Sequence, residues 1–198
     1  TVAGAASAAT WTNEMTCAVT DVTANADDCF GSLMPDPNNV NHVDFNGDTF
    51  DDDGTVTTGM FGHTDWNNLG KIDGDGTDSG GASLGLTADI GDTNGGTWGM
   101  TASLSAYTQV LIILKGGNDF SAYLYNTVAN AESGTFDMPS RINDKGDTKT
   151  SALSNLTVFG RIAGDPPGGV IPLPAGLPLM LSALGIGGLI ARRKRKAA

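Results

Sequence analysis

Apolar residues along positions 10–162 fall in short runs that turn-forming residues separate, a pattern typical of β-strands. The strongest run is residues 107–115 (YTQVLIILK), whose continuous apolar centre predicts a strand buried on both faces. A turn with the sequence GGND follows. Residues 120–125 (FSAYLY) are then predicted to return as the second strand of a hairpin.

Other short segments carry the same signal. No amphipathic helix is expected among them, and 28 glycines punctuate the chain. The pattern predicts an all-β fold, a β-sandwich or jelly roll, over residues 10–162. The further predicted strands are residues 40–45, 69–72, 82–88, 97–104, 133–138 and 151–161.

The C-terminal segment, residues 170–198, has the most specific pattern. Its first 22 residues carry no charge and are largely apolar, which is long enough to cross a bilayer as a helix. Because Pro172, Pro174 and Pro178 disfavour a helix at the start, we expect one short transmembrane helix. A basic stop follows, and the bias of positive charge to the cytoplasm predicts that the preceding chain lies outside. This stop consists of Arg192, Arg193, Lys194, Arg195 and Lys196.

A short signature begins this segment: Ile171, Pro172, Leu173, Pro174, Ala175 and Gly176. Together with the apolar span and the basic stop, it resembles the PEP-CTERM class of bacterial sorting tails, in the VPLPA variety. Ile171 stands where that variety has valine. The resemblance implies that an exosortase, a membrane-embedded cysteine transpeptidase, recognises the signature, cuts nearby and passes the chain to the cell surface. An ordinary single-span anchor with a proline-rich stalk is the alternative.

The middle of the chain resembles, more loosely, the ectodomains that often precede such tails. The matching pieces are Trp98 and residues 110–117, 121–124, 133–136 and 153–156. Asn155 stands where these relatives often have a histidine. Because most of those ectodomains have no assigned activity, the likeness implies a fold rather than a function.

The N-terminal residues are small, and Ala6 and Ala8 have the A-x-A spacing of a signal-peptide cleavage region. We expect a signal-peptide remnant there; the alternative is a terminus of small residues without structure. The expected regions are a remnant at 1–9, a β domain at 10–162, a linker at 163–169 and a sorting signal at 170–198.

Charge is divided unevenly along the chain. All 22 acidic residues and six of the 11 basic ones lie in positions 1–169, which therefore carry a net charge of −16. Such a surface repels nucleic acid and anionic lipid, so neither is an expected ligand of this part. Twenty of the acids are Asp, which favours turns and caps over helix interiors.

Cys17 and Cys29 are the two cysteines of the chain. In an exported protein, cysteines this close are expected to form a disulfide, and closing such a loop stabilises the fold by about 3 kcal/mol. A catalytic thiol is not favoured, because the pair lacks C-x-x-C spacing and a nearby histidine.

Two aspartate-rich stretches, residues 44–54 and 73–78, can supply the several oxygens that calcium requires. Calcium is thus the one possible cofactor. Neither stretch completes the calcium-binding loop of a helix-loop-helix motif, and a pair of solvated Asp-Gly turns is the alternative. The candidate ligands are Asp51, Asp53, Asp73, Asp75 and Asp78.

Catalytic motifs are weak in this sequence. His42 and His63 are its two histidines, and no G-x-S-x-G elbow is present. We therefore expect no enzyme, with a secreted hydrolase using paired carboxylates as an alternative. Trp66, between Asp65 and Asn67, is the candidate for stacking on a carbohydrate, whereas Trp98 is expected in the core.

These observations predict an exported surface or extracellular-matrix protein of a Gram-negative bacterium, sorted by an exosortase and without catalytic activity. Its expected partners are that exosortase, the inner membrane before processing, and extracellular polysaccharide. A calcium-dependent carbohydrate-binding module is the alternative from another class.

Overall fold

A computed structural model describes residues 8–33, 43–74, 78–80, 84–90, 94–117, 119–142 and 148–162. Its contacts divide the chain into Thr1–Asp165 and Pro166–Ala198, and every described residue belongs to the first unit. The described part is all-β, as predicted, and short 3-10 turns occur at Val19–Asp21, Met60–Gly62 and Val128–Ala131. None of these described residues belongs to a helix that is long and apolar enough to span a membrane.

The predicted transmembrane helix and sorting signal lie outside the described residues. The same holds for most of the expected signal-peptide remnant and for the whole of the expected linker, residues 163–169. These expectations stay predictions from the sequence.

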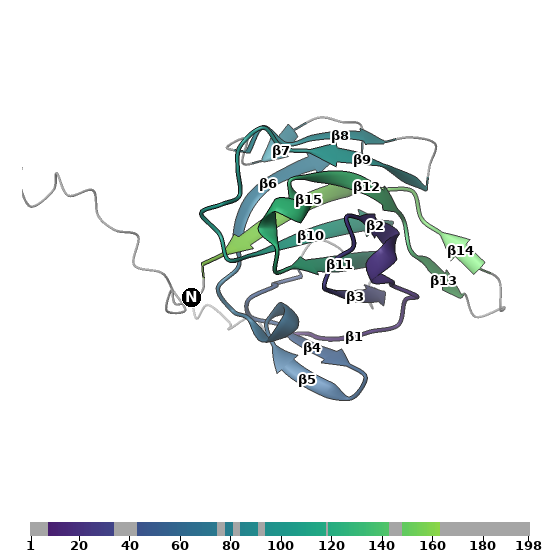
Figure 1. Cartoon of the computed structure of the whole chain (residues 1–198). Helices are drawn as coiled ribbons and strands as arrows, with labels where there is room; N and C mark the ends of the chain where they lie inside the picture. The colour runs from purple at the N-terminus through teal and green to yellow at the C-terminus, as the bar shows by residue number, and fades with distance from the viewer. Residues whose placement is uncertain are drawn as a thin grey trace, which may run out of the picture. The chain divides into compact units, whose positions relative to one another are not determined.

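A six-stranded antiparallel sheet in the order β3-β11-β10-β15-β6-β7 forms the centre of the domain (Figure 1). Its middle pair, β10 and β11, is the predicted hairpin, and the register runs from Val110 opposite Tyr125 to Gly116 opposite Asp119. The strands are β3 (Asp28–Leu33), β6 (Asn67–Asp73), β7 (Asp78–Gly80), β10 (Gln109–Gly116), β11 (Asp119–Tyr125) and β15 (Asn155–Arg161).

Side chains of β10 point alternately to the two faces of this sheet, and both faces are covered. Val110, Ile112 and Leu114 belong to one hydrophobic cluster. Leu111 and Ile113 belong to the other. All five side chains are at most 4% exposed, which confirms the prediction of a strand buried on both faces.

On one face a four-stranded antiparallel sheet, in the order β2-β12-β9-β8, closes the main core (Figure 1). Trp98 and Phe136 from this sheet pack into that core, and the Trp98 indole N–H donates to the Ala131 carbonyl (3.0 Å). A Cβ at Gly134 would lie 2.6 Å from the Trp98 ring, so the close approach requires glycine. The strands are β2 (Val22–Thr23), β8 (Thr87–Ile90), β9 (Gly95–Gly99) and β12 (Ser133–Asp137).

On the opposite face a small sheet of β1 (Thr10–Thr12), β4 (Thr49–Asp52) and β5 (Thr55–Thr58) covers a second, aromatic core. Here β1 runs parallel to β4 and β5 antiparallel to it. Trp11 meets Phe120 edge to face at 5.8 Å between ring centroids, and Phe30 meets Phe50 likewise at 5.5 Å. A two-stranded hairpin of β13 (Ser140–Ile142) and β14 (Thr148–Thr150) completes the described strands.

The predicted strand at residues 40–45 is wrong in its described part, because positions 43–45 contain no strand. The chain instead forms the β4–β5 hairpin within the acidic stretch that follows. The Phe50 side chain of this hairpin is buried. The Asp residues that follow Phe50 in the hairpin are partly or fully exposed. One large buried aromatic ring thus outweighs the poor strand propensity of aspartate.

Asp48, which is 5% exposed, connects the N-terminal strand β1 to the domain through hydrogen bonds. Its carboxylate accepts hydrogen bonds from the Ala9 amide, the Trp11 indole and the Asp44 amide, each at 2.9 Å. Three donors on one buried carboxylate satisfy its hydrogen-bonding capacity and offset its desolvation.

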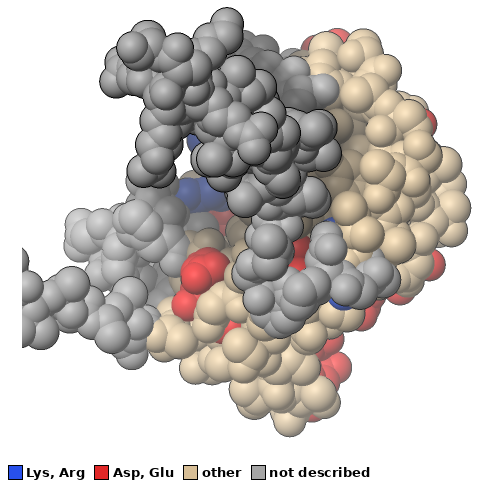
Figure 2. All heavy atoms as spheres, turned by 90° about the vertical axis from the view of Figure 1, so that its left-hand side faces the viewer, with Lys and Arg blue, Asp and Glu red and all other residues tan. Residues whose placement is uncertain are grey.

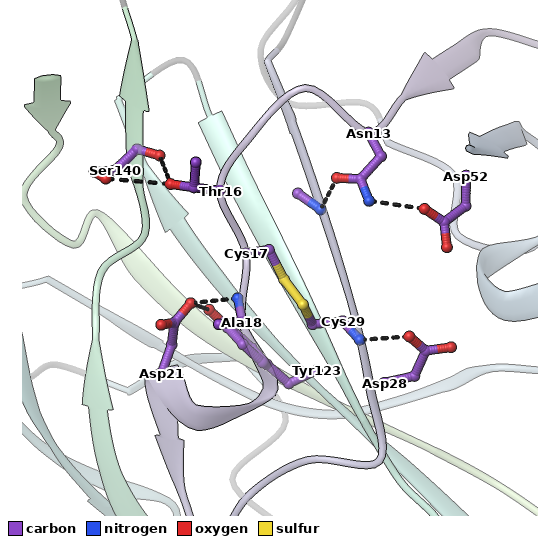
Figure 3. Close-up of a disulfide and its surroundings, with 11 residues drawn as sticks. Asn13, Thr16, Cys17, Ala18, Asp21, Asp28, Cys29, Asp52, Tyr123 and Ser140 are labelled. Carbon is purple, nitrogen blue, oxygen red and sulfur yellow. Dashed lines mark hydrogen bonds between the residues drawn. A yellow bond between two sulfur atoms is a disulfide. The ribbon is translucent and has the colours of Figure 1, made fainter. Parts of the chain in front are cut away.

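The Cys17–Cys29 disulfide confirms the predicted pairing, with 6.1 Å between the two Cα atoms. It joins the segment after β1 to the edge strand β3 (Figure 3). Asn13 strengthens this connection, because its side chain accepts from the Gly31 amide (3.1 Å) and donates to the Asp52 carboxylate (2.8 Å). The edge strand is therefore held covalently and by hydrogen bonds.

Replacing Asp48 by Asn should lower the free energy of unfolding by about 2 kcal/mol, since charge-assisted hydrogen bonds to three donors are lost. Urea unfolding followed by tryptophan fluorescence measures the change. Asp53→Asn is the matched control, because Asp53 is exposed at a left-handed turn position that Asn also adopts. Equal midpoints for the two variants would contradict the role given to Asp48.

Removing the disulfide with Cys17→Ser and Cys29→Ser should destabilise the domain by about 3 kcal/mol, because the unfolded chain regains the freedom of the open loop. Urea unfolding without reductant, compared with that of the parent chain, gives the difference. An unchanged midpoint would show that the bond does not contribute to stability.

Candidate functional site

A pocket of about 420 Å³ opens on the face of the central sheet that carries the aromatic core. Its polar lining residues come from β6, β10 and β15, and its apolar walls from the aromatic core and the segment before β4. This size is within the range of small-molecule sites. The lining consists of Val43, Phe45, Asn68, Lys71, Ile113, Lys115, Phe120, Asn155, Thr157 and Phe159.

Strand alternation explains why polar residues gather here. Asn155, Thr157 and Phe159 occupy every second position of β15 and so share one face, while Leu156 and Val158 between them enter the main core. In the register of the sheet, Lys115 of β10 lies beside Asn155 of β15. Lys71 of β6 lies beside Thr157, on the other edge of β15. The floor of the pocket is therefore regular sheet.

Aromatic rings form one wall of the pocket. Phe45 packs against Phe159 at 5.1 Å and against Phe120 at 5.8 Å between ring centroids, edge to face in both cases. These contacts connect the wall to the aromatic core, which holds the rings in place. The pocket thus places apolar ring surface next to amide, hydroxyl and ammonium groups.

Two of the six basic residues in positions 1–169, Lys71 and Lys115, line this pocket, and the described lining contains no acid. The Lys71 ammonium also pairs with the Asp73 carboxylate at 2.9 Å on a partly exposed rim. Burial lowers the pKa of Lys115, and repulsion from Lys71 lowers it further. On the face drawn in Figure 2, few basic side chains are visible beside the acidic ones of the described residues.

The described lining offers several hydrogen-bonding groups to a ligand. It contains no histidine, cysteine or carboxylate. Asn68, Asn155 and Thr157 can donate and accept hydrogen bonds, and the two ammonium groups can only donate. A polar ligand with hydroxyl groups and a negative charge matches this set.

Trp66 does not lie in this pocket, and the prediction that it offers an exposed stacking face is wrong. Its side chain is 3% exposed within the aromatic core, and its indole N–H donates to the Met60 carbonyl (3.0 Å). Asn46 additionally accepts from the Trp66 backbone amide (2.7 Å). A large apolar ring gains more from this burial than exposure on a loop would allow.

The candidate calcium ligands are not brought together among the residues with described side chains, where no group of three or more potential ligands is found. Asp51 accepts from the Gly54 amide (2.9 Å) in the β4–β5 turn, and Asp53 is exposed in the same turn. Asp73 pairs with Lys71 on a different sheet. Asp75 and the side chain of Asp78 lie outside the described residues.

His63 lies near a partly buried ion pair rather than in the pocket. Arg161 donates through Nε to Asp65 at 2.8 Å, and His63 meets the Trp66 ring edge to face at 5.9 Å. Burial lowers the pKa of His63, the charge of Arg161 lowers it further, and Asp65 acts in the opposite direction. His42 lies outside the described residues.

Sequence reasoning missed the pocket. The pattern of β15 was visible as alternating residues, but its pairing with β6 was not, because nearly half of the chain separates the two strands. The scarcity of lysine in an acidic domain was the one available signal. It draws attention to Lys71 and Lys115 without indicating that they share a site.

No family model, curated protein or solved structure matches the chain. The likeness of residues 98–159 and 170–198 to sorted surface proteins consequently rests on the short motifs quoted above. Function has to be inferred from those motifs and from the geometry of the pocket.

His63 should titrate below its ordinary pKa of about 6.5 in the folded protein. The unfolded chain then takes up the proton more readily, so this contribution to stability is present above pH 6.5 or so and is lost as the pH falls through the lowered pKa. Proton NMR of the two histidines, with His63→Gln for assignment, measures the midpoint. A midpoint at or above the ordinary value would contradict the effect of burial.

Proposed function

We propose that this chain is an exported bacterial surface or extracellular-matrix protein, in which a β-sandwich domain precedes a sorting tail recognised by an exosortase. The single observation that carries the proposal is the order of features in residues 171–196: proline signature, uncharged apolar span and basic stop. The disulfide supports export, because such bonds persist in oxidising compartments outside the cytoplasm.

In this proposal the tail acts first. Its apolar span holds the chain in the inner membrane, with the basic stop in the cytoplasm and the β domain outside. Pro172 and Pro174 keep the signature from becoming helical, so it stays extended and accessible to the transpeptidase. Cleavage near the signature then releases the domain to the surface or matrix, and the domain itself catalyses no step.

The pocket favours carbohydrate binding as a second function. Amide and hydroxyl groups beside aromatic rings suit the mixed polar and apolar surface of a sugar. The site differs from the one expected at Trp66, and no carboxylate of the described lining supports a calcium requirement. For a secreted hydrolase, the described lining supplies neither paired carboxylates nor a histidine, which counts against that alternative.

Replacing Pro172 and Pro174 by Ala should block processing in an exosortase-containing native host, since the signature then loses its extended form. Mass spectrometry of the mature C-terminus is the measurement. The parent chain should end near the signature, and the variant should retain Lys196.

Pro178→Ala is the matched control, because this proline lies in the tail beyond the signature. It should be processed like the parent chain, whereas a strain without the exosortase should process neither. A parent chain that keeps Lys196 at the surface, or normal maturation of the double variant, would reject the sorting proposal.

A further inference from the structure

The pocket has basic lining residues although the domain around it is acidic. Positions 1–169 carry a net charge of −16, yet the ionisable groups of the described lining are two lysines. Burial lowers the pKa of Lys115, and the charge of Lys71, which pairs with Asp73 at 2.9 Å, lowers it further. A negatively charged ligand group in the pocket adds a favourable interaction with both ammonium groups.

The remaining lining specifies more than a charge. Thr157 is buried and donates to the Asn155 side-chain oxygen (3.3 Å), and the Asn155 side chain also carries amide N–H groups that can donate to an acceptor. Asn68 on β6 and Asn155 on β15 share the pocket lining with the rings of Phe45 and Phe159, and Asn68 is the register partner of Phe159. A ligand with hydroxyl groups on its edge and C–H groups on its face contacts both kinds of side chain.

We propose that this pocket binds an acidic sugar, whose anionic group lies between Lys71 and Lys115 and whose ring lies against the phenylalanines. The inference deepens the second function proposed above and rests on it, whereas it is independent of the sorting tail. Uronic acids and sulfated sugars share the required chemistry.

Long polyanions such as nucleic acid fit this site poorly. A ligand extending beyond the pocket meets the acidic surface of the domain, where repulsion acts over a Debye length of about 8 Å at physiological salt. A sugar that brings one negative group into the pocket avoids most of that repulsion. The preferred ligand is accordingly a sparsely charged glycan.

The test begins with the full 198-residue chain in mild detergent on an array of uronic-acid-containing and sulfated oligosaccharides, each beside its neutral counterpart. Calorimetry on the best acidic and neutral pair then gives affinities. The acidic member should bind at least about tenfold tighter than the neutral one, as expected for a charge-assisted hydrogen bond. Acetate and sulfate alone should bind far more weakly than the acidic sugar.

Variants assign the binding to the pocket. Lys71→Gln and Lys115→Gln should each weaken binding of the acidic sugar about tenfold while leaving the neutral sugar unchanged. Asn155→Ala should weaken both sugars alike. Lys149→Gln is the matched control, since Lys149 is exposed on β14 outside the pocket, and it should change neither affinity. Thermal unfolding verifies that each variant is folded.

Specific outcomes overturn the inference. Equal binding of acidic and neutral sugars would contradict recognition of the anionic group by the pocket. A loss of affinity in Lys149→Gln as large as in the pocket variants would contradict it as well. Free acetate or sulfate binding as tightly as the acidic sugar reduces the site to an ion site. Absence of binding to every acidic glycan rejects the inference, while the C-terminal mass of the mature protein still decides the sorting proposal separately.

Discussion

The fold depends on the β10–β11 hairpin, whose side chains reach both faces of the central sheet. Because the strand period is two, its register assigns Val110, Ile112 and Leu114 to the main core and Leu111 and Ile113 to the aromatic core. A slip by one residue would exchange these sets between two cores of different shape. Pairing with β3 on one side and β15 on the other holds the register along its length.

The acidic composition has a structural basis in the turns. A short aspartate side chain can accept a hydrogen bond from a nearby backbone N–H, which glutamate reaches less well. Asp44 accepts from the Asn46 amide (3.0 Å), Asp51 from the Gly54 amide (2.9 Å) and Asp21 from the Ala18 amide (2.8 Å). The stretch at 44–54, first considered for calcium, thus contains aspartates with local structural partners, and Asp48 extends the same chemistry to the attachment of β1.

Local signals predicted the parts of the fold that are themselves local. The apolar run of β10, the GGND turn and the returning strand β11 are adjacent in sequence, and the two cysteines are close enough to pair. The strands before residue 40 were missed, because β3 combines Asp28, Gly31 and Ser32 with a single buried ring, Phe30. The pocket depends on the non-local pairing of β15 with β6, which no periodicity along one segment reveals.

Alternating residues of strand β15 contribute to the main core and to the pocket. Leu156 and Val158 fill the main core, while Asn155, Thr157 and Phe159 shape the pocket from the other side of the same backbone. Substitutions of Asn155 and Thr157 can therefore change the chemistry of the cavity with little penalty to the main core, provided that Leu156 and Val158 stay aliphatic.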